Sequence, residues 1–113
     1  MQIKVKVIIF KDPNSPVIGP GPLRLLEKIK ELKSINQAAK NMNLSYVKAL
    51  NMLNKLEENL EHKILVRRRG GNERGGAELT PFAEAYIENY RSLEQKINRF
   101  SEKTFQTFLE QTE

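Results

Sequence analysis

The chain has 113 residues, a length at which we expect one domain with one hydrophobic core and no separate sensing or catalytic domain. It contains no cysteine and a single histidine, which excludes disulfides, zinc fingers, thiolate catalysis and clusters of histidine ligands, and which fits a cytosolic protein. The formal net charge is +5 at pH 7, and this surplus favours a polyanionic partner.

The N-terminal residues predict a strand over 2–10, because Ile3, Val5 and Val7 alternate with Lys4 and Lys6. The lysines, and the lack of a small-residue cleavage site after them, argue against a signal peptide. No apolar run approaches the roughly 18 residues of a membrane-spanning helix, so we expect no membrane association. Turn-forming residues fill 12–16, and residues 17–18 suit a short return strand.

Three helices are predicted between residues 22 and 60. The first covers about 22–33, where leucine and isoleucine recur at helical spacing. Ser34 and Gln37 form a capping box, in which the serine hydroxyl accepts from an amide three residues on, and they start a short helix over about 35–42. A tight turn at 43–44 then leads to Ser45, the predicted N-cap of a helix over about 46–60.

This third helix has two faces when drawn on a helical wheel. The apolar face is expected to join the core. The opposite face is polar and mostly basic near its N-terminal end, with Lys48, Asn51, Lys55 and Glu58.

A basic hairpin is predicted next, with strands over 63–67 and 77–80 and a glycine-rich tip between them. Residues 63–76 carry five basic side chains against one acidic one, so the positive charge is densest here. We reject a nucleotide phosphate loop, because the segment lacks the Gly-Lys-Ser/Thr ending and leads into a strand.

The last predicted helix covers about 81–110, with Thr80 as its N-cap and Pro81 at its first position. Its apolar residues follow a spacing of four and three, as in a coiled-coil seam. The small core cannot cover this stripe, so we expect it to pair with the same helix of a second chain. The predicted dimer residues are Phe82, Tyr86, Tyr90, Leu93, Ile97, Phe100 and Phe108.

The order of these elements predicts a fold that is mainly α with a small β component: a winged helix-turn-helix with a long C-terminal dimerisation helix. The short helix and the third helix form the helix-turn-helix pair, and the basic hairpin is the wing. Residues 1–80 are expected to form the DNA-binding domain, and residues 81–113 the dimerisation helix.

Residues 34–60, SINQAAKNMNLSYVKALNMLNKLEENL, resemble the helix-turn-helix of LysR-type and molybdate-responsive (ModE-type) bacterial regulators. The likeness to ModE proteins is closer: it includes Ser45 and Tyr46 and the segment GGNERGGAELT at 70–80, and it spans about residues 3–95. One departure is Leu50, where the family often has tryptophan. The resemblance implies a winged fold, DNA binding and dimerisation. Molybdate sensing is not carried over, because we expect the sequence to end before the family's molybdate-binding domain.

The residues expected to contact DNA lie on the third helix, at the start of the second and in the wing. A recognition helix enters a major groove about 12 Å wide, where lysine can bind phosphate or guanine and asparagine can pair with adenine. Arginines of the wing are expected to contact phosphates or the minor groove. The predicted set is Ser34, Gln37, Ser45, Tyr46, Lys48, Asn51, Lys55, Arg67, Arg68, Arg69, Asn72 and Arg74.

The functional hypothesis is a transcriptional regulator that binds double-stranded DNA sequence-specifically as a cytoplasmic homodimer, without cofactor, metal or evident small-molecule effector. We expect no enzyme, because no nucleophile stands beside a base, and because Glu57, Glu58 and Glu61 are predicted to be surface charge. Two alternatives remain open: a winged-helix module that binds a protein partner, and one that binds RNA.

Overall fold

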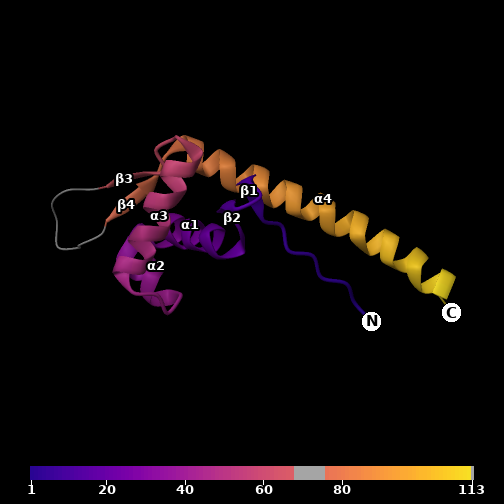
Figure 1. Cartoon of the computed structure of the whole chain (residues 1–113). Helices are drawn as coiled ribbons and strands as arrows, with labels where there is room; N and C mark the ends of the chain where they lie inside the picture. Colours follow the sequence, from indigo (N-terminus) through magenta and orange to yellow (C-terminus); the bar gives the residue numbers. More distant parts are fainter. Residues whose placement is uncertain (68–75, 113) are drawn as a thin grey trace.

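The computed structural model describes residues 1–67 and 76–112, which form two β-hairpins and four helices (Figure 1). In chain order the elements are β1 (Ile9–Asp12), β2 (Ser15–Ile18), α1 (Pro20–Leu32), α2 (Ile35–Asn41), α3 (Tyr46–Leu60), β3 (Leu65–Arg67), β4 (Ala77–Leu79) and α4 (Pro81–Thr112). The fold is mainly α with a small β component, as predicted. The molecule is elongated, with extents of 62 × 28 × 23 Å, because α4 projects far beyond the other elements.

The first strand lies later in the chain than predicted. β1 pairs antiparallel with β2, with Ile9 opposite Ile18, so the predicted return strand is confirmed. The predicted strand over 2–10 is wrong for residues 2–8, which have no strand partner in the described part of the chain. The alternation nevertheless persists in burial: Val5 and Val7 are half-buried, whereas Lys6 is exposed. The two-residue period therefore marks a segment with one face against the protein rather than a hydrogen-bonded strand.

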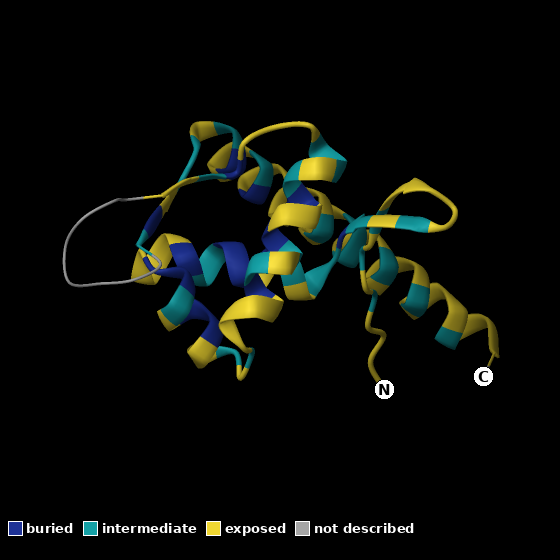
Figure 2. Ribbon diagram, turned by 60° about the vertical axis from the view of Figure 1, so that its left-hand side comes forward, coloured by how far each residue is buried: buried dark blue, intermediate teal, exposed yellow. Residues whose placement is uncertain are grey.

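The core is made where α1, α2 and α3 meet, and its residues are dark blue in Figure 2. Leu23, Leu26 and Ile29 of α1 are fully buried, at the helical spacing that the sequence predicts. Ala38 and Ala39 of α2 are also buried. Because alanine carries only a methyl group, α2 can approach its neighbouring helices closely.

The helix boundaries agree with the predicted ones to within two residues, because the predicted caps form. Ser34 Oγ accepts a hydrogen bond from Gln37 N at 3.1 Å, and Ser45 Oγ accepts one from Lys48 N at 3.0 Å. Asn43, in the turn between α2 and α3, has a φ of 56°. Asparagine tolerates this left-handed conformation better than most residues, so it suits a turn that must reverse the chain in few residues.

The wing is anchored to the helices at its base. β3 and β4 pair antiparallel, with Arg67 opposite Ala77, which confirms the predicted hairpin. Ala77 N donates to the carbonyl of Lys33 at 3.2 Å, and Thr80 N donates to the carbonyl of Ile64 at 2.9 Å. The first bond fixes the wing beside the connection between α1 and α2, and the second closes the hairpin at its base.

α4 has a buried beginning and an exposed remainder. Thr80 Oγ1 caps it by accepting from Ala83 N at 3.2 Å, and Ala83, Ile87 and Tyr90 are buried. At the next residue, Arg91 Nε donates to Glu27 Oε2 of α1 at 3.0 Å. Beyond this point the helix runs away from the core, with the N-terminal segment near it (Figure 1). Within the described ranges, no helix is both long and apolar enough to cross a membrane.

Candidate nucleic-acid interface

The polar face of α3 is exposed over its first three turns. Lys48, Asn51 and Lys55 are exposed, and spacings of three and four residues keep them on one side of the helix. Tyr46 is 36% exposed at the start of the helix. Ser45 is also exposed, although its hydroxyl is occupied as the N-cap. Lys48, Asn51 and Lys55 therefore share one exposed polar face, whereas Ser45 and Tyr46 lie at the N-terminal end of the helix and Tyr46 is on another side of it.

The start of α2 contributes one exposed residue to this region. Gln37 is exposed on the first turn of α2. The predicted DNA contact by the Ser34 side chain is wrong, because Ser34 is 2% exposed and its hydroxyl caps α2. Ser34 instead forms a β-bridge with Gly76, which holds the base of the wing at the start of α2.

The wing adds positive charge next to the two helices. Arg67 is exposed at the end of β3. The predicted contacts Arg68, Arg69, Asn72 and Arg74 lie outside the described residues. β3, β4, α2 and α3 all lie at the end of the molecule that is far from the C-terminus of α4 (Figure 1). Helix-turn-helix and wing strands thus share one end of the molecule.

Glu57 joins α3 to the wing, a role that the sequence prediction missed. Its Oε1 accepts hydrogen bonds from the backbone N–H groups of Ile64 at 3.1 Å and Leu65 at 3.4 Å. A carboxylate among lysines at a helix end looks like surface charge, and so the sequence prediction treated it. The signal that could have found it is position, because Glu57 lies on the last turn of α3, directly before the chain turns back into β3.

The first two predicted dimer residues are partly used within the chain. Phe82 is half-buried and stacks on the His62 ring, with 3.9 Å between ring centroids and 11° between planes. Tyr86 is half-buried, and burial raises the pKa of its hydroxyl. For Tyr90 the dimer prediction is wrong, because its side chain is 2% exposed and its hydroxyl donates to the carbonyl of Val7. The core of its own chain accounts for Tyr90.

The remaining predicted dimer residues lie on the projecting part of α4 and are largely exposed. Leu93 is 41% exposed, Phe100 71% and Phe108 56%, and Ile97 is half-buried. Phe105, which the prediction omitted, stacks on Phe108 with 6.0 Å between ring centroids. An exposed apolar stripe of this length is unusual for a surface that only meets water.

The described residues provide no group of three histidine, cysteine, aspartate or glutamate side chains that could hold a metal ion. Every buried side-chain nitrogen or oxygen among them has a hydrogen-bond partner.

Residues 21–84 match the family model of the bacterial regulatory helix-turn-helix proteins of the lysR family. The chain belongs to this lysR family. The match runs from the first turn of α1 through the helix-turn-helix and the wing to the first turn of α4. It leaves β1, β2 and most of α4 outside.

Individual relatives place this lysR-family chain near the ModE regulators. It is 36% identical over 95 residues to the transcriptional regulator ModE of Haemophilus influenzae, and this covers 84% of the chain and 34% of the relative. It is 32% identical, with the same coverage, to the DNA-binding transcriptional dual regulator ModE of Escherichia coli K12. The chain spans about a third of the length of these relatives.

The fold of this lysR-family chain also matches a solved structure. The crystal structure of a CbnR_DBD–DNA complex superposes with a TM-score of 0.58 and 21% identity, covering 77% of this chain and 94% of the other. The likeness confirms the winged helix-turn-helix fold that the order of the elements predicts.

Proposed function

We propose that this chain binds double-stranded DNA sequence-specifically as a homodimer in the bacterial cytoplasm and regulates transcription. The observation that carries the proposal is the exposed polar face of α3, with Lys48, Asn51 and Lys55, together with the exposed Arg67 at the end of β3. The DNA in the CbnR_DBD complex and the DNA-binding description of Escherichia coli ModE support the same partner here.

In this proposal α3 lies in the major groove. Lys48 and Asn51 are close to its N-terminal end, from which recognition helices reach base edges. An asparagine amide can form two hydrogen bonds with adenine, and a lysine can donate to guanine or to phosphate. Gln37 and Arg67 flank the helix and are assigned to the phosphate backbone, which sets affinity rather than sequence preference.

The homodimer is supported by the exposed apolar stripe of α4. In this arrangement residues 1–80 contact DNA and residues 81–113 join the two copies, with the first turns of α4 completing each core. Two copies related by a two-fold axis would recognise an inverted repeat, with half-sites about 34–36 Å apart or at a multiple of that distance.

The test compares operator and random DNA with single substitutions. The operator is first selected from genomic fragments with the purified chain. Asn51→Ala and Lys48→Ala should reduce the preference for the operator over random duplex by about tenfold each, because each good base contact contributes about 1–3 kcal/mol of discrimination. Arg67→Ala should weaken binding to both duplexes alike. Asn89→Ala, an exposed asparagine on α4, is the matched control and should change neither.

An RNA-binding or protein-binding module would give a different result. Structured RNA that displaces duplex DNA at equal concentration would favour the RNA alternative. If Asn51→Ala and Lys48→Ala kept the same preference for the operator over random DNA as Asn89→Ala, sequence-specific binding through α3 would be overturned.

A further inference from the structure

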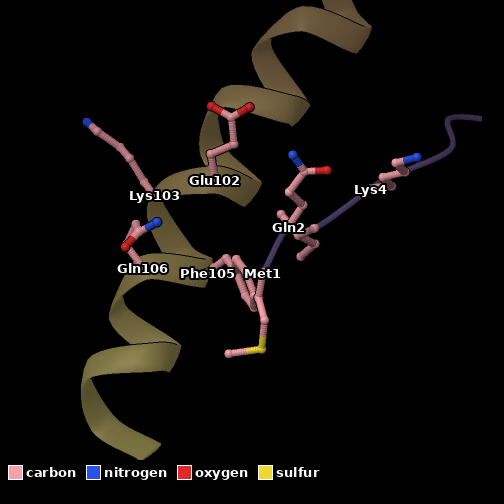
Figure 3. A pocket seen from close by; sticks show the side chains of 8 residues that line it. Met1, Gln2, Lys4, Glu102, Lys103, Phe105 and Gln106 are labelled. Atoms are coloured by element: carbon pink, nitrogen blue, oxygen red, sulfur yellow. The ribbon is translucent and has the colours of Figure 1, made fainter. Parts of the chain in front are cut away.

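The N-terminal segment, residues 1–8, lies beside the projecting half of α4. Tyr90 of α4 donates its hydroxyl hydrogen to the carbonyl of Val7, which ties the segment to the helix. Further along, Met1, Gln2 and Lys4 line a hollow of about 640 Å³ together with Glu102, Lys103 and Phe105 of α4 (Figure 3). The N-terminal segment thus runs along one side of the exposed part of α4.

A second hollow, which we term the α4 groove, lies between the N-terminal segment and the apolar stripe. It has a volume of about 510 Å³ and is lined by Ile3, Phe100, Ser101, Thr104, Phe105 and Phe108. None of these side chains carries a charge. The hollow in Figure 3 differs in this respect, because Lys4, Glu102 and Lys103 border it.

We propose that the α4 groove receives α4 of a second copy of this chain, so that the N-terminal segment forms part of the dimer interface through Ile3. This inference rests on the homodimer of the proposed function. It adds a residue outside α4 to the interface, and it explains why a segment with a strand-like pattern lies along a helix instead of joining a sheet.

Self-complementarity points to a second copy as the occupant. A two-fold interface brings the same surface of each chain together, so that surface must carry both a projection and a hollow. Here Phe100 and Phe108 project, at 71% and 56% exposed, directly beside the groove that they help to line. Because the groove is uncharged, two identical surfaces can meet there without placing like charges in contact.

The size of a stable interface also requires more than the apolar stripe. At about 200 Å² for a phenylalanine side chain, Phe100 and Phe108, the two most exposed residues of the stripe, provide roughly 250 Å², and Leu93 and Ile97 each add less than either of them. A standard interface buries about 800 Å² per partner. The N-terminal segment supplies further surface along the same line, including Ile3, which is 40% exposed.

The experiment measures the dimer dissociation constant of the full chain by analytical ultracentrifugation. Ile3→Ser should raise this constant about tenfold, because a two-fold interface loses the apolar contact twice. Lys4→Ser is the matched control: it is the next residue, exposed, and not part of the α4 groove, so it should leave the constant unchanged. Phe100→Ser, in the stripe itself, should weaken the dimer at least as much as Ile3→Ser.

The outcomes separate this inference from the proposed function. A dimer that Phe100→Ser dissociates but Ile3→Ser does not would overturn the role of the N-terminal segment and leave the α4 dimer standing. Equal weakening by Ile3→Ser and Lys4→Ser would also overturn it, because the effect would then not come from the groove. A wild-type chain that sediments as a monomer at every concentration would overturn the homodimer itself. Thermal unfolding at low concentration, where all variants are monomers, should give equal midpoints and so exclude a folding defect.

Discussion

A single carboxylate connects α3 with the wing. Glu57 accepts hydrogen bonds from the N–H groups of Ile64 and Leu65, and Ile64 is fully buried. The Ile64 carbonyl in turn accepts from Thr80 N, just before α4. The last turn of α3, the base of the wing and the start of α4 therefore meet at Ile64.

Replacing Glu57 by alanine should destabilise the fold and loosen the wing. Two backbone N–H groups would lose their acceptor in a partly buried place, and we expect a loss of about 1–3 kcal/mol in the free energy of unfolding. Chemical denaturation measures this loss. Glu58→Ala removes an exposed carboxylate of the same helix and is the control, with an expected change within about 0.5 kcal/mol. Equal changes in both variants would contradict the role assigned to Glu57.

Tyr90 should make stability depend on alkaline pH. Burial, and then the charge of Glu94, raise the pKa of its hydroxyl above the ordinary value of 10.0, because the neutral phenol is favoured in the folded chain. The contribution of the neutral phenol is therefore complete below about pH 10 and is lost as the pH rises above that value. Tyr90→Phe should lower the free energy of unfolding at pH 7 by about 1 kcal/mol and flatten its fall above pH 10. If the free energy of unfolding of Tyr90→Phe fell above pH 10 as steeply as that of the wild type, the alkaline dependence would not come from Tyr90.

The sequence predicted the roles of some of these residues and not of others, because some interact with near neighbours in the chain and others with distant residues. Ser34, Ser45 and Thr80 were predicted as caps, because a cap depends only on the next three residues of the chain. Tyr90 was misassigned because its partner, Val7, is 83 residues away and the local spacing of α4 could not reveal it. Glu57 was missed for a similar reason, since its partners lie across a turn.

At the scale of elements, the ion pair between α1 and α4 helps to set the direction in which α4 leaves the core. Arg91 contacts Glu27 of α1 and also Glu94 of its own helix, at 2.7 Å from Nη1 to Oε1. The hydrogen bond with Glu27, ahead of the other causes, raises the pKa of the Arg91 guanidinium, so this side chain stays positively charged at any physiological pH. It follows directly on the buried stretch of α4, which ends at Tyr90.

Arg91→Ala should therefore change geometry more than stability. The pair is partly exposed, so its loss should lower the free energy of unfolding by about 1 kcal/mol or less. The variant should, however, discriminate less between the original operator and operators whose half-sites are moved apart by one or two base pairs. A gel-shift series of such operators checks this, with Arg99→Ala, another exposed arginine of α4, as the control. Unchanged selectivity in Arg91→Ala would remove the pair from the determinants of spacing.

The elements themselves were largely predictable, with one instructive exception. Helices and wing strands followed from periodicity and caps, since each has a local signal. The N-terminal strand did not, because alternation reports that one face is covered without saying by what. Residues 2–8 lie near a helix, and a segment that packs one face against a helix can show the same alternation as a strand in a sheet.

At the scale of the whole molecule, binding to DNA should depend steeply on salt. Lys55 and Arg67 give two exposed basic groups per chain for phosphate and four per dimer, apart from Lys48, which is proposed to contact a base. The slope of log affinity against log salt should therefore be about −3.5 or steeper, at roughly −0.9 per phosphate contacted. Fluorescence anisotropy at increasing salt measures it, and Arg67→Ala should make the slope shallower by about 2 per dimer. A slope shallower than about −2 would contradict a phosphate-based interface.

The length of α4 makes it a lever. It has 32 residues, and the part beyond Arg91 is about 30 Å long at 1.5 Å per residue. A tilt of about 10° at the Glu27–Arg91 contact would therefore move the far end by about 5 Å, which exceeds the 3.4 Å rise of one base pair. In the proposed dimer, a change of a few degrees at this contact would therefore alter the distance between the two DNA-binding ends without any rearrangement of either core.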